Sequence, residues 1–340
     1  MQMSYQKLLK LALIIMIGFT SSLFAQDKSI NALDILKNSG SKIDYKALDA
    51  GEIINIARTD QELTDTSIAL SMALYVKAPY SKVLKDIKAS SNKLSSYKHA
   101  LLIDIKETSN LAPYFSKVTF VKDEQKEVEA LFDFESGDSF NLSKDEISKW
   151  KALTKDKKAD IKIASSFYQE ILQNRLQEYL KKGVKGIASY NHLDDDTTVS
   201  LGMEKSSAFL NSFKTMIPDL YADYMNFPKV TSKETKQSFF IIKDELEGRP
   251  TFILKHQMSK ENSNMFIVAE RQFFISHDLD AIQTQIICIP YKDGTLIALS
   301  SQSFTPKVSG FGRSIAVEIG RKMMGKQILP MLESIQKKYK

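Results

Sequence analysis

Cysteine is almost missing from this sequence of 340 residues, in which Cys288 is the single example. One cysteine excludes a disulfide scaffold within the chain, and it excludes zinc or iron–sulfur sites built from several cysteines. Cys288 lies in the apolar run 286–289, so we expect a buried and chemically inert thiol.

Proline and glycine are also scarce, with eight and thirteen residues, and neither internal repeats nor low-complexity linkers occur. This composition excludes a collagen-like chain, and 43% apolar residues exclude a wholly disordered one. A large excess of one charge is missing too, since 47 basic residues face 41 acidic ones. Because the charges are scattered, the sequence predicts no nucleic-acid partner.

Long hydrophobic runs are limited to residues 11–19, which follow Lys7 and Lys10. This run is too short for a bilayer span, which needs roughly 20 apolar residues. It is typical of a secretory leader, and Ala25 suits the position before a cleavage point. We therefore expect residues 1–25 to be a cleaved signal peptide and the protein to be exported to the bacterial periplasm. A retained membrane anchor is the alternative.

Motifs for metal binding and covalent catalysis are missing as well. No H-E-x-x-H sequence occurs, and the acidic run 194–196 lacks the spacing of a calcium loop. No G-x-S-x-G sequence offers a nucleophilic serine on a strand-to-helix turn. We expect neither a metal nor another cofactor.

The part of the chain after the leader opens with a polar extension at 26–65, which has helical patterns at 30–36 and 45–56. A strand at 67–77 then passes through Ala78-Pro79 directly into a helix. Further strand-like runs follow at 101–105, 118–121 and 128–134.

A mainly helical pattern covers residues 140–228. It includes a capping box, S-x-x-E, at 143–146 and a long amphipathic helix at 161–180. A further helix is predicted at 207–224, with Pro218 bending or splitting it.

Strands separated by turns dominate from residue 236, and one long helix closes the chain at 311–337. The predicted strands are 238–243, 251–258, 265–276, 281–289 and 296–304. The apolar positions of the last helix form a single stripe: Ile315, Ile319, Met323, Met324, Ile328, Leu332 and Ile335.

This order of elements, with V-x-A-P-x-x-x-V at Val76, Ala78, Pro79 and Val83, resembles the START-like (SRPBCC, helix-grip) superfamily. The resemblance implies an α+β fold in which a curved antiparallel sheet wraps around a long C-terminal helix and leaves an apolar cavity. Residues 66–340 would form this START-like domain, with 140–228 as a helical insertion.

More narrowly, the chain is similar to a family of uncharacterised secreted bacterial proteins. The shared motifs are Gly137-Asp138 followed by Leu142-Ser143, the segment 175–190, and Arg271-Gln272 with Ser276-His277. This likeness implies a fold and lends no activity.

Three residues on the predicted strands are candidates for ligand binding. Alternation places Arg271 and His277 on one largely apolar face, where they could orient a polar group of a ligand. The alternative is an arginine paired with a carboxylate and a histidine in a turn. His256 shares a face with Phe252, Leu254 and Met258, and could equally be a core histidine.

The last helix offers further candidates. Arg313, after Gly310-Phe311-Gly312, could hold an anionic group at the helix N-terminus, or the glycines could form a simple turn. Met323 and Met324 could line a wall facing apolar ligands, or pack in an ordinary core. The basic residues Arg321, Lys322 and Lys326 on the other flank could be solvated or could contact anionic lipid.

We therefore expect an exported protein that binds a hydrophobic small molecule or lipid non-covalently in an internal cavity, in a role such as envelope lipid transport. A cyclase- or hydrolase-like enzyme is one alternative, with His277 or His256 as acid–base and Arg271 stabilising an anion. A structural envelope protein that docks a partner through 140–228 is the other. Fold-level analogy carries these expectations.

Overall fold

The structure, a computed structural model, describes residues 43–56, 66–90, 96–134, 139–191, 196–206, 214, 216–305, 308 and 313–340. The expected signal peptide, the helical pattern at 30–36 and Gly310-Phe311-Gly312 lie outside the described residues. Every element below belongs to the larger of the chain's two compact units, Ala32–Lys340.

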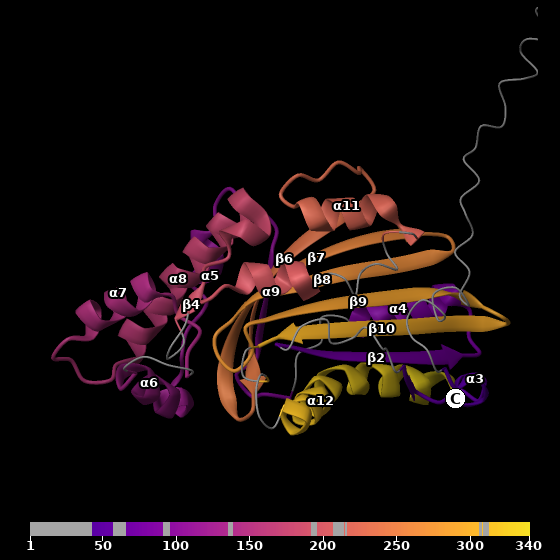
Figure 1. The fold of residues 1–340 in the computed structure, drawn as a ribbon, viewed down its shortest axis with the longest axis horizontal. Coiled ribbons are helices and arrows are strands. Elements are labelled where there is room, and N and C mark those ends of the chain that lie inside the picture. Colours follow the sequence, from indigo (N-terminus) through magenta and orange to yellow (C-terminus); the bar gives the residue numbers. More distant parts are fainter. Residues whose placement is uncertain are drawn as a thin grey trace, which may run out of the picture. The chain divides into compact units, whose positions relative to one another are not determined.

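An eight-stranded antiparallel sheet is the main feature of this unit (Figure 1). In spatial order its strands are β1 (Ile54–Asn55), β2 (Ser67–Val76), β10 (Gly294–Phe304), β9 (Ala281–Tyr291), β8 (Met265–Ile275), β7 (Arg249–Asn262), β6 (Lys236–Leu246) and β3 (Leu101–Ile105). Strands β6 to β10 follow one another along the chain as hairpins. The turn between β6 and β7 uses Glu247 and Gly248, both at positive φ, where glycine carries no steric cost.

The helices lie before the run of hairpins and after it. They are α3 (Tyr45–Asp49), α4 (Tyr80–Ser90), α5 (Ala112–Phe115), α6 (Gln125–Phe132), α7 (Lys144–Thr154), α8 (Ile161–Lys182), α9 (Val199–Ser206), α11 (Pro218–Asn226) and α12 (Arg313–Tyr339). Two 3-10 turns, Lys122–Glu124 and Gly183–Gly186, and a small ladder of β4 (Tyr190–Asn191) with β5 (Asp196–Thr197) connect them.

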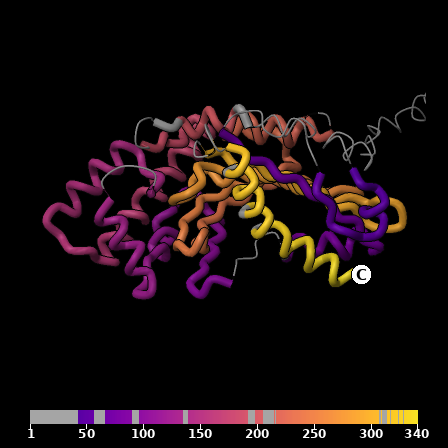
Figure 2. The backbone as a smooth tube through the Cα atoms, turned by 60° about the horizontal axis from the view of Figure 1, so that its bottom comes forward, coloured from indigo at the N-terminus to yellow at the C-terminus, as the bar shows by residue number. Residues whose placement is uncertain are grey.

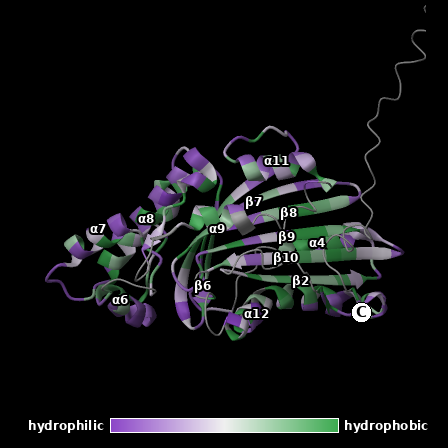
Figure 3. Ribbon diagram, in the orientation of Figure 1, coloured by the Kyte–Doolittle hydropathy of each residue, from purple (hydrophilic) through white to green (hydrophobic). Residues whose placement is uncertain are grey.

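One face of the sheet is covered by α4 and α12, and Figure 2 shows α12 in yellow lying across the strands. A cluster of buried apolar residues lies beneath these helices, and Figure 3 shows hydrophobic residues concentrated on β2, β8, β9 and β10. We call this set the aliphatic cluster: Met72, Leu74, Val76, Ala78, Val83, Leu84, Ile87, Phe266, Val268, Ile286, Cys288, Ile297, Leu299, Leu332 and Ile335.

The opposite face of β6 to β8 is covered by helices from the middle of the chain, chiefly α8 and α11. Aromatic rings fill the space between helix and sheet, and the closest pair, Tyr179 of α8 and Phe273 of β8, stacks with centroids 3.9 Å apart. We call this set the aromatic layer: Phe120, Tyr168, Tyr179, Tyr224, Phe252 and Phe273.

The expectation of a helix-grip START-like fold is wrong. The chain is an α+β protein with a large antiparallel sheet, but the sheet is open. Its edge strands β1 and β3 each have a single neighbour, so the sheet does not close around α12. Helices of the segment 140–228 instead bury the second face, which makes the sheet a layer between two sets of helices.

Several local predictions also differ from the structure. The pattern at 45–56 gives only the short helix α3 and then strand β1. The run at 128–134 is part of helix α6, because Val128 and Leu131 are buried at helical spacing and packing decides over strand propensity. Residues 118–121 form no strand.

The starts of two helices in 140–228 agree better with the local sequence motifs. The predicted capping box is confirmed at the start of α7, where the Ser143 hydroxyl accepts from the Glu146 N–H and the Glu146 carboxylate accepts from the Ser143 N–H. Pro218 splits the helical stretch rather than bending it: residues 214 and 216 are helical, Ile217 is not, and Pro218 begins α11, where its missing N–H costs nothing.

Candidate functional site

Arg271 and His277, expected on one face of a single strand, are separated by a β-bulge. The pairing of β7 with β8 shifts between Leu254 and Lys255, which leaves Phe273 as an extra residue in β8. An extra residue reverses the alternation of side chains beyond it. The expectation that Arg271 and His277 share a face is therefore wrong.

Arg271 lies in the aromatic layer and is only 1% exposed. Its Nη1 donates to the Tyr179 hydroxyl at 2.9 Å, and its Nη2 donates to the Tyr224 carbonyl oxygen at 3.3 Å. The guanidinium also lies 4.1 Å from the centre of the Tyr224 ring, within cation–π distance. Among the described residues no carboxylate pairs with Arg271, and its Nε has no hydrogen-bond partner.

His256 adjoins this arginine, as the alternation on β7 predicts, and is completely buried. Its Nδ1 lies 2.8 Å from the Tyr179 hydroxyl. That hydroxyl also accepts from Arg271, so it joins the two side chains, while Nε2 of His256 has no hydrogen-bond partner among the described residues. Burial, and secondly the Arg271 charge, hold the pKa of His256 well below its usual value, so the ring is neutral.

Tyr179, His256 and Arg271 thus form a sealed polar chain rather than an open site. None of the three is more than 1% exposed. Burial raises the pKa of Tyr179, which keeps its hydroxyl protonated and available to join the two neighbours. The structure favours the prediction of a core histidine, and it gives Arg271 the role of a buried donor to tyrosine oxygens.

His277 lies beyond the bulge and is also completely buried. Its Nδ1 lies 2.6 Å from the Asp278 carboxylate, and its Nε2 lies 2.9 Å from the Thr251 hydroxyl and 3.2 Å from the Pro250 carbonyl oxygen. The Thr251 hydroxyl already donates to the Arg249 carbonyl oxygen, so it can only accept from the ring. These contacts tie the β6–β7 turn to the end of β8 through the His277 ring.

The candidates on α12 are scattered. Met324 is buried against Ile68, Val308 and Val317, so it packs in a core as the alternative predicts. The side chain of Met323 lies outside what the structure describes, as do the residues just before Arg313. Arg313 is the first residue of α12 and is half-buried.

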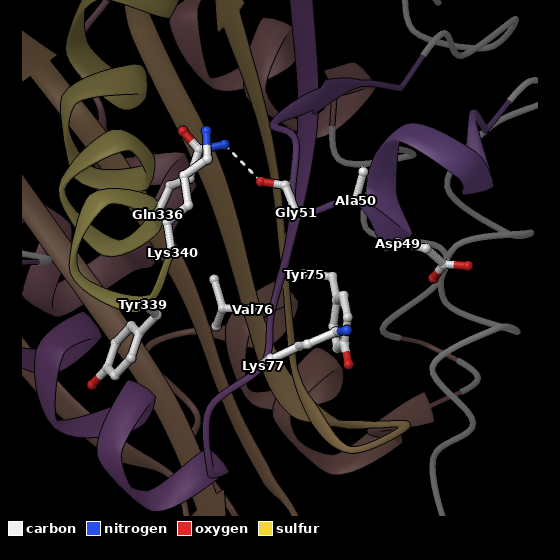
Figure 4. A pocket seen from close by; sticks show the side chains of 9 residues that line it. All are labelled: Asp49, Ala50, Gly51, Tyr75, Val76, Lys77, Gln336, Tyr339 and Lys340. Carbon is white, nitrogen blue, oxygen red and sulfur yellow. Dashed lines mark hydrogen bonds between the residues drawn. The ribbon is translucent and has the colours of Figure 1, made fainter.

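A pocket of about 300 Å³ lies at the other end of α12, where none of the candidate residues is found (Figure 4). It is formed by the end of α3, the end of β2 and the last turn of α12. It is half-open to solvent, and its lining residues are Asp49, Ala50, Gly51, Tyr75, Val76, Lys77, Gln336, Tyr339 and Lys340. We call it the α3–α12 pocket.

Hydrogen bonds fix most polar groups of the pocket. The Gln336 amide donates to the Gly51 carbonyl oxygen at 2.6 Å, which links α12 to the α3 turn (Figure 4). The Asp49 carboxylate pairs with Lys292 at 2.6 Å. Burial and the neighbouring carboxylate of Asp293 raise the pKa of Tyr75 to about 12, so this phenol stays neutral.

Lys77 differs from these groups. It is exposed, and among the described residues it has no ion-pair partner. The pocket therefore combines an apolar wall, Val76 with the rings of Tyr75 and Tyr339, and two exposed lysines, Lys77 and Lys340, neither of which has an ion-pair partner among the described residues. This is the composition of a site for a small molecule with an apolar body and an anionic or accepting group.

Sequence reasoning missed this pocket because its residues come from three distant segments and no motif joins them. Within the described part of the chain, no group of three or more metal-ligating side chains gathers. Among the same residues, no helix has the length and apolar character that a membrane span requires. No protein-family model, no curated protein and no solved structure matches this chain.

Proposed function

We propose that this protein binds a small amphipathic molecule non-covalently in the α3–α12 pocket. The observation that carries the proposal is the pocket itself: about 300 Å³ with an apolar wall and Lys77 at its lining. That volume is at the lower end for ligand sites. It suits a small hydrophobic acid, or the end of one lipid, better than a whole phospholipid.

The expected position of the ligand differs from the internal cavity that the sequence suggested. Between α12 and the sheet, the side chains of the aliphatic cluster pack together along β2, β8, β9 and β10. The α3–α12 pocket lies at the end of the same helix and is open to solvent, and it is the ligand site that we propose. Because the sequence also predicts a signal peptide, the proposed role is that of a carrier or sensor of hydrophobic molecules in the bacterial envelope.

Binding is favoured over catalysis by the state of the two histidines. His256 is neutral and sealed, and both ring nitrogens of His277 lie within hydrogen-bond distance of protein atoms. General acid–base catalysis needs a group within hydrogen-bond reach of a substrate proton. Neither ring has solvent access in this structure, since both are 0% exposed.

The first test is native mass spectrometry of the protein purified from its own envelope, followed by organic extraction. A reproducible bound mass that releases an amphipathic molecule is expected. The pocket is then located with anilinonaphthalene sulfonate, a dye with an apolar body and an anionic group. We expect saturable fluorescence with the wild-type protein.

Two pairs of variants show whether the dye occupies this pocket. Ala50→Trp fills the pocket and should abolish saturable binding, whereas Ala130→Trp, at an exposed position of α6, should leave it unchanged. Lys77→Gln should weaken binding about tenfold because it removes one of the two lysines of the pocket, and Lys126→Gln, at an exposed lysine of α6, should not weaken it. Equal binding by both members of each pair, with no mass released on extraction, contradicts the proposed function.

A further inference from the structure

Two large apolar side chains of α12 are exposed although the sequence predicts them in the core stripe. Ile315 is 66% exposed and Ile319 is 55% exposed. The buried side of the same helical stretch is formed by Val317 and Met324, which pack against Ile68. At 100° per residue, positions 315 and 319 lie on the side of the helix opposite to those two residues.

Basic residues extend this apolar pair along the same side of the helix. Lys322 and Lys326 are seven residues after Ile315 and Ile319, or about two turns, and both lysines are exposed. Glu318 is the acidic residue next to the pair. Over its whole length α12 carries six basic and two acidic residues, so the helix is much more positive than the balance of 47 to 41 in the complete chain.

We propose that this side of α12, formed by Ile315, Ile319, Lys322 and Lys326, docks onto the surface of an anionic lipid bilayer. Apolar side chains on one face of a helix insert at the boundary between headgroups and acyl chains, and lysines beside them bind the phosphates. A protein partner with a purely apolar patch would leave both lysines without counter-charges. The charge of the helix therefore favours a bilayer over a second copy of the chain.

The contact is expected to be weak and reversible. Two isoleucines and two lysines supply far less binding free energy than the insertion of a membrane-spanning helix. Salt screens the ionic part of this free energy. Reversible contact fits a protein that meets a membrane only to exchange a bound molecule. The inference nevertheless rests on α12 alone and does not require that the α3–α12 pocket binds anything.

Vesicle sedimentation tests the proposal directly. The purified mature protein is mixed with vesicles of phosphatidylglycerol and phosphatidylcholine in equal parts, and with vesicles of phosphatidylcholine alone. We expect binding to the anionic vesicles at about 50 mM salt and loss of most of it at about 500 mM. Binding to neither kind of vesicle, or equally to both, overturns the proposal.

Three variants assign the contact to this side of α12. Ile315→Ser with Ile319→Ser should weaken partitioning about tenfold, and Lys322→Gln with Lys326→Gln should weaken it by a similar factor. The matched control is Leu201→Ser, since Leu201 on α9 is 51% exposed and lies outside this side of α12. The control should bind vesicles as the wild type does.

Circular dichroism and sedimentation velocity complete the experiment. All of the substituted residues are exposed, so the thermal unfolding midpoints should stay close to that of the wild type. Vesicle binding that the isoleucine variant retains contradicts the proposal. So does a dimer that dissociates in this variant while vesicle binding is unchanged, because the apolar pair then serves a second copy of the chain.

Discussion

The aliphatic cluster and the aromatic layer lie on opposite faces of one sheet and are stabilised in different ways. The aliphatic cluster buries side chains without polar groups, so its free energy comes from area removed from water and does not depend on direction. The aromatic layer buries three cations, Arg175, Lys243 and Arg271, each no more than 6% exposed. Every one of them depends on specific partners.

Because of this difference, substitutions on the two faces should lower the stability of the protein for different reasons. Loss of a methyl group from the aliphatic cluster leaves a cavity whose cost scales with volume. Loss of one partner in the aromatic layer leaves a buried charge or an unpaired polar atom, whose cost depends on what remains nearby. The following predictions test this distinction, beginning with the largest expected effect.

Lys243→Met should produce the largest loss of stability. Lys243 donates to the Glu124 carboxylate and to the Thr119 carbonyl oxygen, both at 2.6 Å, and both charged side chains are at most 4% exposed. Removing the lysine leaves a buried carboxylate with only the Tyr97 hydroxyl and the Val121 N–H. We expect the free energy of unfolding in urea to fall by about 3 to 5 kcal/mol.

Two further variants show whether the loss comes from the orphaned charge. The double variant Lys243→Met with Glu124→Gln should recover a large part of the stability, since neither position of the pair then carries a charge. Lys182→Met removes an exposed ion pair with Glu178 and should cost less than about 1 kcal/mol. A double variant less stable than Lys243→Met would show that the pair is not the cause.

Leu332→Ala tests the aliphatic cluster. Leu332 is completely buried in α12 against strands of the sheet, so truncation removes transfer free energy and leaves a cavity. We expect a loss of about 3 kcal/mol in urea unfolding. Leu201→Ala, at an exposed position, should change stability by less than about 0.5 kcal/mol. Unlike the Lys243 variant, Leu332→Ala should not be rescued by any single polar substitution.

Hydrophobic patterning predicts the aliphatic cluster better than the aromatic layer. The strand at 67–77, the helix after Pro79 and the periodic residues Leu332 and Ile335 all indicate that cluster through their spacing in the sequence. The same reasoning wrongly includes Ile315 and Ile319, which lie on the side of α12 opposite to the buried Val317 and Met324.

The polar contacts of the aromatic layer could not be predicted in the same way. A single extra residue, Phe273, separates Arg271 from His277, and no turn signal marks a bulge inside a strand. The partners of Arg271 come from α8 and α11, 92 and 47 positions away respectively. The α3–α12 pocket was missed for a similar reason, since three distant segments form it.

His256→Phe tests the aromatic layer through the pH dependence of the free energy of unfolding. The pKa of His256 is lowered in the folded protein, so below its ordinary value of 6.5 the unfolded chain binds a proton that the folded chain does not. Stability is therefore lost as the pH falls from 6.5 toward the folded pKa, by up to about 1.4 kcal/mol per pH unit. The phenylalanine variant should lack this part of the slope.

The measurement is urea unfolding of both proteins between pH 8 and pH 5. The Phe227 and Phe239 rings already contact His256, so a phenylalanine ring fits the site in shape. The difference in stability between wild type and variant should be constant above pH 7 and should change in favour of the variant below pH 6.5. Parallel curves over the whole range would show that folding does not lower the pKa of His256.

Ser143→Ala is expected to have the smallest effect, although it lies in the same network of helices. The variant loses one hydrogen bond, which the serine hydroxyl accepts from the Glu146 N–H at 3.3 Å, and this predicts a cost of about 1 kcal/mol. Glu146→Gln should cost more, because Glu146 also binds Arg175 through two hydrogen bonds of 2.8 and 2.5 Å. If both variants lose the same stability, the capping bond and the ion pair act as one unit. A larger loss in Glu146→Gln instead shows that the buried cation, and not the cap, connects α7 to α8.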